Sequence, residues 1–296
     1  MPIQDRETVA SRLLRASAAR SCDPRTEIDW DAALDPALPA VPEHRVSLYG
    51  TRLWAEMTEQ QRVRLSWHEF ASISSVGLWF ELILMQALLR YAYDQDPHTR
   101  HVQYALTEIG DETRHSVMFA RAADALAPGA RYRPSKAIHQ LGRLFKTTAA
   151  GPALFASVLV AEETLDRLQR ELMQTAGMLP LAQQVARVHV TEEARHVAYA
   201  RTAVERQVPR LSRPQLEWHR TLTAITSICV VESFLDPAVY TAVGLDRDRA
   251  VHEARHNPQH RESRLWMAER VTGFLREAGI IGGPTTQLWR HAGLLA

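Results

Sequence analysis

The pattern of apolar positions along the chain is helical over long stretches. Between Thr58 and Tyr93, apolar residues recur every three or four positions, as in Leu78, Leu82 and Met85, and this spacing puts them on one face of a helix. Prolines fall between the periodic segments, as expected because an interior proline breaks a helix. Alternating β-branched stretches bounded by turn dipeptides, which are typical of strands, are absent from the sequence. The sequence therefore predicts an all-α protein.

The breaks in this pattern divide the chain into segments. Four long helices are expected, at Thr58–Tyr93, Pro97–Ala127, Gly151–Thr175 and Pro180–Gln207. Further helices are expected at Ser135–Thr148, Pro214–Phe234, Arg247–Asn257 and Gln259–Glu277. Residues 1–50 contain several prolines, so a short helix near Val9–Ala19 should lead into a mostly irregular arm that drapes over the bundle. We expect a single domain over residues 1–296, with an N-terminal arm (1–50), bundle helices (58–207) and additional flanking helices (214–277).

The composition of the chain argues against several classes of protein. The chain has 296 residues with 35 Lys and Arg against 34 Asp and Glu, a net charge of +1, so a nucleic-acid backbone is not expected as its partner. Cys22 and Cys229 are the only cysteines, which excludes a disulfide framework or a thiolate-rich metal site. The first residues, from Met1 to Arg6, are polar, and the longest apolar run, Gly151–Ala161, is about half of what a membrane span needs. A cytoplasmic protein without a membrane partner is expected.

Two of the long helices carry the same short motif, Glu-x-x-His. It occurs as Glu112 with His115 and again 81 positions later as Glu193 with His196. At this spacing a carboxylate and an imidazole lie on one helix face, one turn apart, and can reach the same metal ion. In ferritin-like di-iron proteins a four-helix bundle supplies two such pairs and one further Glu from each of the other two helices. The sequence should therefore contain two more glutamates, one upstream of each motif.

The same offset of 81 positions identifies them as Glu81 and Glu162. Each lies 31 positions before the Glu of its motif, so the chain contains an internal duplication. The neighbouring Glu163 shares its helix face with Asp166 and Arg167 and is interpreted as solvated. Carboxylate and imidazole ligands suit iron or manganese better than zinc, and iron is expected. The six predicted ligands of a carboxylate-bridged dinuclear site are Glu81, Glu112, His115, Glu162, Glu193 and His196.

His189 departs from the duplication, because the offset pairs it with Glu108. It lies four positions before Glu193 and seven before His196, so it should face the metals. It is either a third imidazole ligand or a core histidine bonded to a buried acid. Glu108 is expected to accept a hydrogen bond near the site and not to be a ligand.

Four charged residues next to the motifs have alternative interpretations. Asp111 and Glu192 precede the motif glutamates and either orient the ligand histidines across the bundle or are solvated. Arg114 and Arg195 either bind a substrate carboxylate or pair with nearby acids.

The additional histidine, His189, makes the chain similar to one particular family of di-iron proteins. With His189-x-x-x-Glu193-x-x-His196, it resembles the para-aminobenzoate N-oxygenase family of non-haem di-iron oxygenases. The similarity extends to residues 27–31, 47–51 and His68-Glu69. The resemblance implies two iron ions per chain, and O2 bound as a peroxo-diferric species that oxidises an arylamine nitrogen to hydroxylamine, nitroso or nitro in specialised metabolism. It also implies seven metal ligands: Glu81, Glu112, His115, Glu162, His189, Glu193 and His196.

The six-ligand core alone fits two other functions. These are a di-iron monooxygenase acting on carbon and an iron-oxidising ferritin-like protein without an organic substrate. The chain has no Gly-x-Gly-x-x-Gly motif, so the electrons of any oxygenase should come from an external donor, either a protein or a small reductant. A homodimer is expected, because most soluble oligomers are symmetric homo-oligomers.

His252-Glu253-Ala254-Arg255-His256 matches the signature of zinc proteases. Asn257-Pro258 follows the motif directly. The roughly forty residues after the motif are too few to build a substrate cleft. This motif is interpreted as the end of a surface helix.

Overall fold

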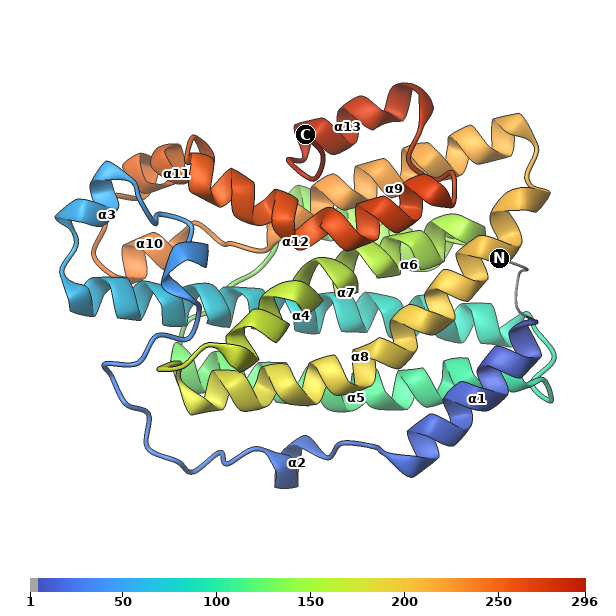
Figure 1. The fold of residues 1–296 in the computed structure, drawn as a ribbon, viewed down its shortest axis with the longest axis horizontal. Helices are drawn as coiled ribbons and strands as arrows, with labels where there is room; N and C mark the ends of the chain where they lie inside the picture. The colour runs from blue at the N-terminus through green and yellow to red at the C-terminus, as the bar shows by residue number, and fades with distance from the viewer. Residues whose placement is uncertain (1–4) are drawn as a thin grey trace.

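The structure is a computed structural model that describes residues 5–296 (Figure 1). Residues 1–4, part of the polar N-terminal stretch noted in the sequence, lie outside the described residues. Within residues 5–296 the chain forms helices and no strand, which confirms the all-α prediction.

Four long helices form the bundle. α4 (Glu59–Tyr93) packs along α5 (Arg100–Leu126), and α7 (Gly151–Gln174) packs along α8 (Pro180–Gln207). Contacts of α5 with α8 and of α4 with α7 join the two pairs. The connection between the pairs contains α6 (Lys136–Thr148), which lies on α4. Two helix pairs joined by one long crossover are the arrangement of a ferritin-like bundle.

The ends of these helices follow from local hydrogen bonds. Thr58 begins α4 with a capping box, in which Thr58 and Gln61 each bond the backbone of the other. α5 begins at Arg100 and not at Pro97, because Asp96 forms a turn: its carboxylate accepts from the His98 amide at 2.9 Å. α7 begins at Gly151, whose φ of +60° lies in the left-handed region that favours glycine.

The remaining helices cover the bundle. α9 (Arg213–Ser233) and α12 (Pro258–Glu277) pack on α7, and α1 (Arg6–Ala19) packs on α5 and α8 (Figure 1). α11 (Arg247–Arg255) ends two residues earlier than predicted, because the Asn257 side chain caps α12 by accepting from the Gln259 amide at 3.0 Å. Four short helices were not predicted: α2 (Pro24–Glu27), α3 (Arg52–Glu56), α10 (Ala238–Ala242) and α13 (Thr286–His291). They are too short to show a helical period.

Two segments are long and apolar enough to cross a membrane by length and composition. They are Glu59–Tyr93 and Arg213–Ala242, and 44% of the most apolar window of each is buried inside the fold. The first is α4, which packs against α5, α6, α7 and α10. Its buried apolar residues, such as Leu65, Leu84 and Leu88, belong to the core of the bundle.

Candidate metal centre

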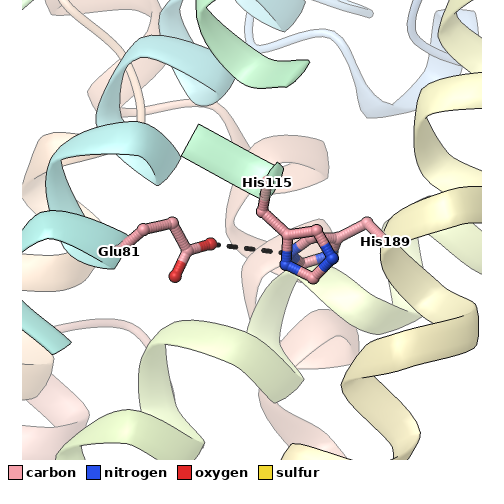
Figure 2. A group of neighbouring side chains, drawn as sticks. All are labelled: Glu81, His115 and His189. Carbon is pink, nitrogen blue, oxygen red and sulfur yellow. Dashed lines mark ion pairs between the residues drawn. The ribbon is translucent and has the colours of Figure 1, made fainter. Parts of the chain in front are cut away.

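The seven residues expected as ligands lie together at the centre of the bundle. Each is at most 5% exposed, and all four bundle helices contribute. Figure 2 shows Glu81 of α4 with its carboxylate directed at the rings of His115 of α5 and His189 of α8. One possible ligand atom from each of these three residues lies within 4.8 Å of the other two. Three further groups of this kind together include the remaining four of the seven residues.

The two Glu-x-x-His motifs face each other across the bundle. His115 Nδ1 lies 2.8 Å from Glu112 Oε2, and His196 Nδ1 lies 3.0 Å from Glu193 Oε1, as helical spacing requires. His196 Nδ1 is also 2.9 Å from Glu112 Oε1, on the other helix. The Nδ1 atoms of both rings are therefore directed at the carboxylates that the duplication predicts as metal ligands.

The opposite nitrogen of each ring meets an acid from the other helix. His115 Nε2 lies 2.9 Å from Glu192 Oε2, and His196 Nε2 lies 3.2 Å from Asp111 Oδ2. Asp111 and Glu192 are buried, so the orienting interpretation is right and the solvated one is wrong. An acceptor at Nε2 favours the tautomer with the proton there, which leaves the Nδ1 lone pair for a metal ion.

Arg114 and Arg195 pair with the same two acids. Arg114 forms ion pairs with Asp111 and Glu192, and Arg195 Nη2 lies 3.4 Å from a carboxylate oxygen of each. The Cys22 amide, in the N-terminal arm, donates to Glu192 at 3.0 Å. Burial alone would raise the pKa of Glu192, but the bonds from His115 and Cys22 hold it below its usual value. Both arginines are therefore paired with acids, as the second interpretation expected.

His189 has two different environments at its two nitrogens. Nδ1 lies 2.9 Å from Oε1 of Gln169, which fixes the orientation of the ring. Nε2 has no hydrogen-bond partner among the described residues and lies 3.5–3.7 Å from oxygens of Glu81, Glu162 and Glu193. Burial lowers the pKa of His189 to about 4, so the ring is neutral. This geometry favours the ligand interpretation over the core-histidine one.

Gln169 was missed at the level of sequence. The available signal was its position on α7, seven residues and two turns after Glu162, on the same helix face.

If all four glutamates were ionised, they would carry more negative charge than the protein around them balances. Burial raises the pKa of both Glu81 and Glu162, and the charges of neighbouring glutamates raise each further. Glu81 Oε2 and Glu193 Oε2 are buried without a hydrogen-bond partner among residues 5–296. Four carboxylates would offset the charge of two divalent cations, and the neutral imidazoles would add ligands without changing that balance. The residues present fit a pair of metal ions.

The interpretation of Glu163 as solvated is wrong. Glu163 is 7% exposed and forms a two-point ion pair with Arg201 of α8, at 2.5 and 3.2 Å. In the sequence, the polar neighbours Asp166 and Arg167 predict a solvent-exposed face for α7. Instead α7 contacts α4, α8, α9 and α12, so it is covered almost all around.

Glu108 is buried beside the predicted site. One of its carboxylate oxygens lies within 4.8 Å of possible ligand atoms of Glu112 and His196. Its Oε2 accepts no hydrogen bond from any described residue. The expected role as a hydrogen-bond acceptor therefore stays a prediction.

The protease-like motif lies on α11 and its C-terminal cap residue, outside the four bundle helices (Figure 1). His256 Nδ1 lies 2.8 Å from the carbonyl oxygen of His252, and Glu253 bonds the Leu53 amide. Among the described residues, no group of three possible metal ligands includes either histidine.

Comparison with known proteins agrees with the geometry. Uncharacterised proteins from Mycobacterium bovis and Mycobacterium tuberculosis are each 25% identical to this chain over 296 aligned residues. The alignments cover 94% of this chain and 84% of each relative. Residues 3–279 match the profile of the p-aminobenzoate N-oxygenase AurF family. Because this match spans nearly the whole chain, including both halves of the duplicated bundle, the protein belongs to the p-aminobenzoate N-oxygenase AurF family.

Proposed function

We propose that this protein is a non-haem di-iron oxygenase that uses O2 to oxidise the nitrogen of an arylamine to hydroxylamine, nitroso or nitro. The observation that carries the proposal is the convergence of seven buried side chains from four helices, with the Nε2 atom of His189 unpartnered among them. The proposed ligands of two iron ions are Glu81, Glu112, His115, Glu162, His189, Glu193 and His196.

The protein's own residues would hold, orient and insulate the metals. Asp111 and Glu192 fix the rings of His196 and His115, and Gln169 fixes the ring of His189. The burial of the ligands excludes bulk water, which strengthens every electrostatic interaction in the site. When bound, two ferrous ions would supply two electrons and polarise O2.

The reaction needs a reductant beyond the chain. Converting an amine to a hydroxylamine with O2 consumes two electrons and two protons, forms one N–O bond and releases one water. The amine must be neutral, because the nitrogen lone pair forms the new bond. After each turnover the irons would have to be reduced again, so we propose an external electron donor.

Incubating the reduced, iron-loaded protein with O2 and a panel of arylamines tests the proposal. We expect hydroxylamine, nitroso or nitro products. Hydroxylation of carbon would support a carbon monooxygenase instead, and iron oxidation without organic product would support a ferritin-like iron oxidase. Glu112→Ala, with circular dichroism to check its fold, controls for chemistry by free iron.

We also propose that the protein is a single-domain homodimer in a reducing cytoplasm, which is where two unpaired cysteines are stable. Exposed Leu82 and Leu89 on α4, and Leu106 and Val117 on the neighbouring α5, offer apolar surface for a second copy. Light scattering of the purified protein tests the dimer: a mass of one chain would contradict it.

A further inference from the structure

An apolar cavity of about 160 Å³ lies between α4, α6, α7 and α9 and reaches the predicted metal centre. Aromatic and aliphatic side chains form most of its wall, among them Trp79, Phe145, Leu222 and Val230. Phe80, Ala161 and Glu162 line both this cavity and a smaller one that also contacts Glu81 and His189. A molecule in the cavity would therefore lie against Glu162, one of the proposed ligands.

The size and the apolar lining of the cavity suit one aromatic ring. An apolar cavity of about 150 Å³ is large enough to bind benzene. Thr148 and Thr226 line the wall, but their hydroxyls already donate to carbonyls of their own helices, at 2.7 and 2.9 Å. The hydroxyl of Ser157, which is 3% exposed, has no partner among the described residues. It can form one hydrogen bond to a neutral group of a bound molecule.

The side chains that line the cavity include no cation to balance a negative charge. No Lys, Arg or His is among its lining residues, and Glu162 carries the one carboxyl group among them. Arg114 and Arg195, the cations next to the metal motifs, are paired with Asp111 and Glu192. A carboxylate on the ring would lose part of its hydration between these apolar side chains without gaining a partner.

We propose that this cavity is the substrate site and that the substrate is an uncharged, single-ring arylamine without a carboxylate. This inference rests on the proposed function for the identity of the reacting group. The amine would lie at the Glu162 end, and the far edge of the ring would point toward α6. The entrance of the cavity lies between α6 and α9, where three lining residues are exposed to solvent: Leu141, Leu144 and Ile225.

Binding measurements on the oxidised, iron-loaded protein test the inference without turnover, so failure of N-oxygenation would not affect the result. The matched probes are 4-methylaniline and 4-aminobenzoate, which share ring and amine and differ in a methyl group against a carboxylate. We expect calorimetry to give at least tenfold tighter binding of 4-methylaniline. Equal or tighter binding of 4-aminobenzoate would overturn the inference. It would favour the separate cavity lined by Arg45 and Arg264 as the substrate site.

Gly142 of α6 provides a variant that fills the cavity. A Cβ atom there would lie 2.5 Å from Cζ2 of Trp79 and 2.8 Å from Cδ1 of Ile83, so Gly142→Ala must displace the Trp79 indole. We expect at least a tenfold loss of 4-methylaniline binding. Gly273→Ala, on α12, is the matched control, because its Cβ would meet nothing within 4 Å. Unchanged binding in a folded Gly142→Ala variant would overturn the assignment of the cavity.

A substitution at Leu144 changes the charge at the entrance of the cavity without disturbing the packed interior. It is 58% exposed and lines the cavity, so Leu144→Arg should fold and place a guanidinium at the entrance. We expect 4-aminobenzoate binding to tighten at least fivefold, while Tyr93→Arg, at the exposed end of α4 and outside the cavity lining, has no effect. An equal response of both variants would mean that the charge acts nonspecifically, and it would overturn the entrance assignment.

Discussion

Glu192 and His115 belong to different helices, α8 and α5, yet Glu192 Oε2 lies 2.9 Å from His115 Nε2. Asp111 of α5 makes the reciprocal contact with His196 of α8, at 3.2 Å. Each half of the duplicated sequence therefore orients the histidine of the other half. Neither half can assemble the predicted metal centre alone, and this dependence ties the two helix pairs of the bundle together.

Removing one of these acids should weaken metal binding without removing a ligand. Glu192→Ala leaves His115 free to rotate and to change tautomer. Loss of such an orienting partner usually costs a factor of 10 to 100 in metal affinity. We expect a loss of this size when the protein competes with a chelator for iron.

Glu205→Ala is the control for this variant, because Glu205 is an exposed glutamate on the same helix. Equal iron affinity of Glu192→Ala and wild type would show that the contact with His115 does not support the site.

The proposed ligands predict a metal count. Protein produced with iron should hold about two metal ions per chain, as in other two-metal sites. Glu112→Ala and Glu193→Ala should each lose at least half of this metal, because each glutamate lies close to both motif histidines. Elemental analysis measures the count, and circular dichroism checks that the variants fold. One zinc per chain, unchanged in both variants, would contradict a dinuclear site.

The duplication explains why much of the candidate site could be predicted from sequence. Two identical spacings of 31 positions fix where Glu81 and Glu162 lie relative to their Glu-x-x-His motifs, once both segments are helical. Packing of four such helices then leaves little freedom in which faces meet. His189 could be found in the same way, because it lies one helical turn before Glu193.

Features that depend on contacts between distant segments could not be predicted. Glu163 has polar neighbours on its own helix, and only the position of α8 brings Arg201 against it. Gln169 shares a helix face with Glu162, but only the position of α8 brings His189 against it. The contact of Cys22 with Glu192 joins residues 170 positions apart, and it depends on the path of an irregular arm.

A buried carboxyl away from the metal centre should make stability depend on pH. Glu69 is 2% exposed and accepts hydrogen bonds from the amide and hydroxyl of Ser47, at 3.2 and 2.5 Å. Burial raises the pKa of Glu69 from its ordinary 4.5 to about 7, although the Ser47 bonds oppose the rise. Between these two values the folded protein holds a proton that the unfolded chain has lost. Stability is therefore lost as pH rises through this range, by at most about 3 kcal/mol.

Glu69→Gln should remove this dependence, because an amide stays neutral. Relative to wild type, we expect the melting temperature of Glu69→Gln to rise as pH increases from 5.5 to 8. Exposed Glu59→Gln, on the same helix, is the control and should shift the melting temperature equally at both ends of the range. A difference between Glu69→Gln and wild type that stays constant with pH would contradict the raised pKa.

His189 is the residue that most sharply separates the proposed N-oxygenase from a generic six-ligand di-iron protein. Its Nε2 faces three of the proposed carboxylate ligands, while Gln169 holds Nδ1. Six ligands remain after its removal, so His189→Ala should keep at least half of the iron. We expect the same variant to lose most of its arylamine oxidation. The optical spectrum should also change after O2 is added to the reduced protein.

Two further variants separate a metal ligand from a packing role at this position. Gln169→Leu keeps the imidazole but removes its orienting bond, so it should lose less activity than His189→Ala while altering the same spectrum. His252→Ala, on α11, should leave activity, iron content and spectrum as in wild type. If His189→Ala formed product at the wild-type rate with an unchanged spectrum, His189 would be a core histidine. The preference for nitrogen oxidation over a generic di-iron oxidase would then lose its main structural support.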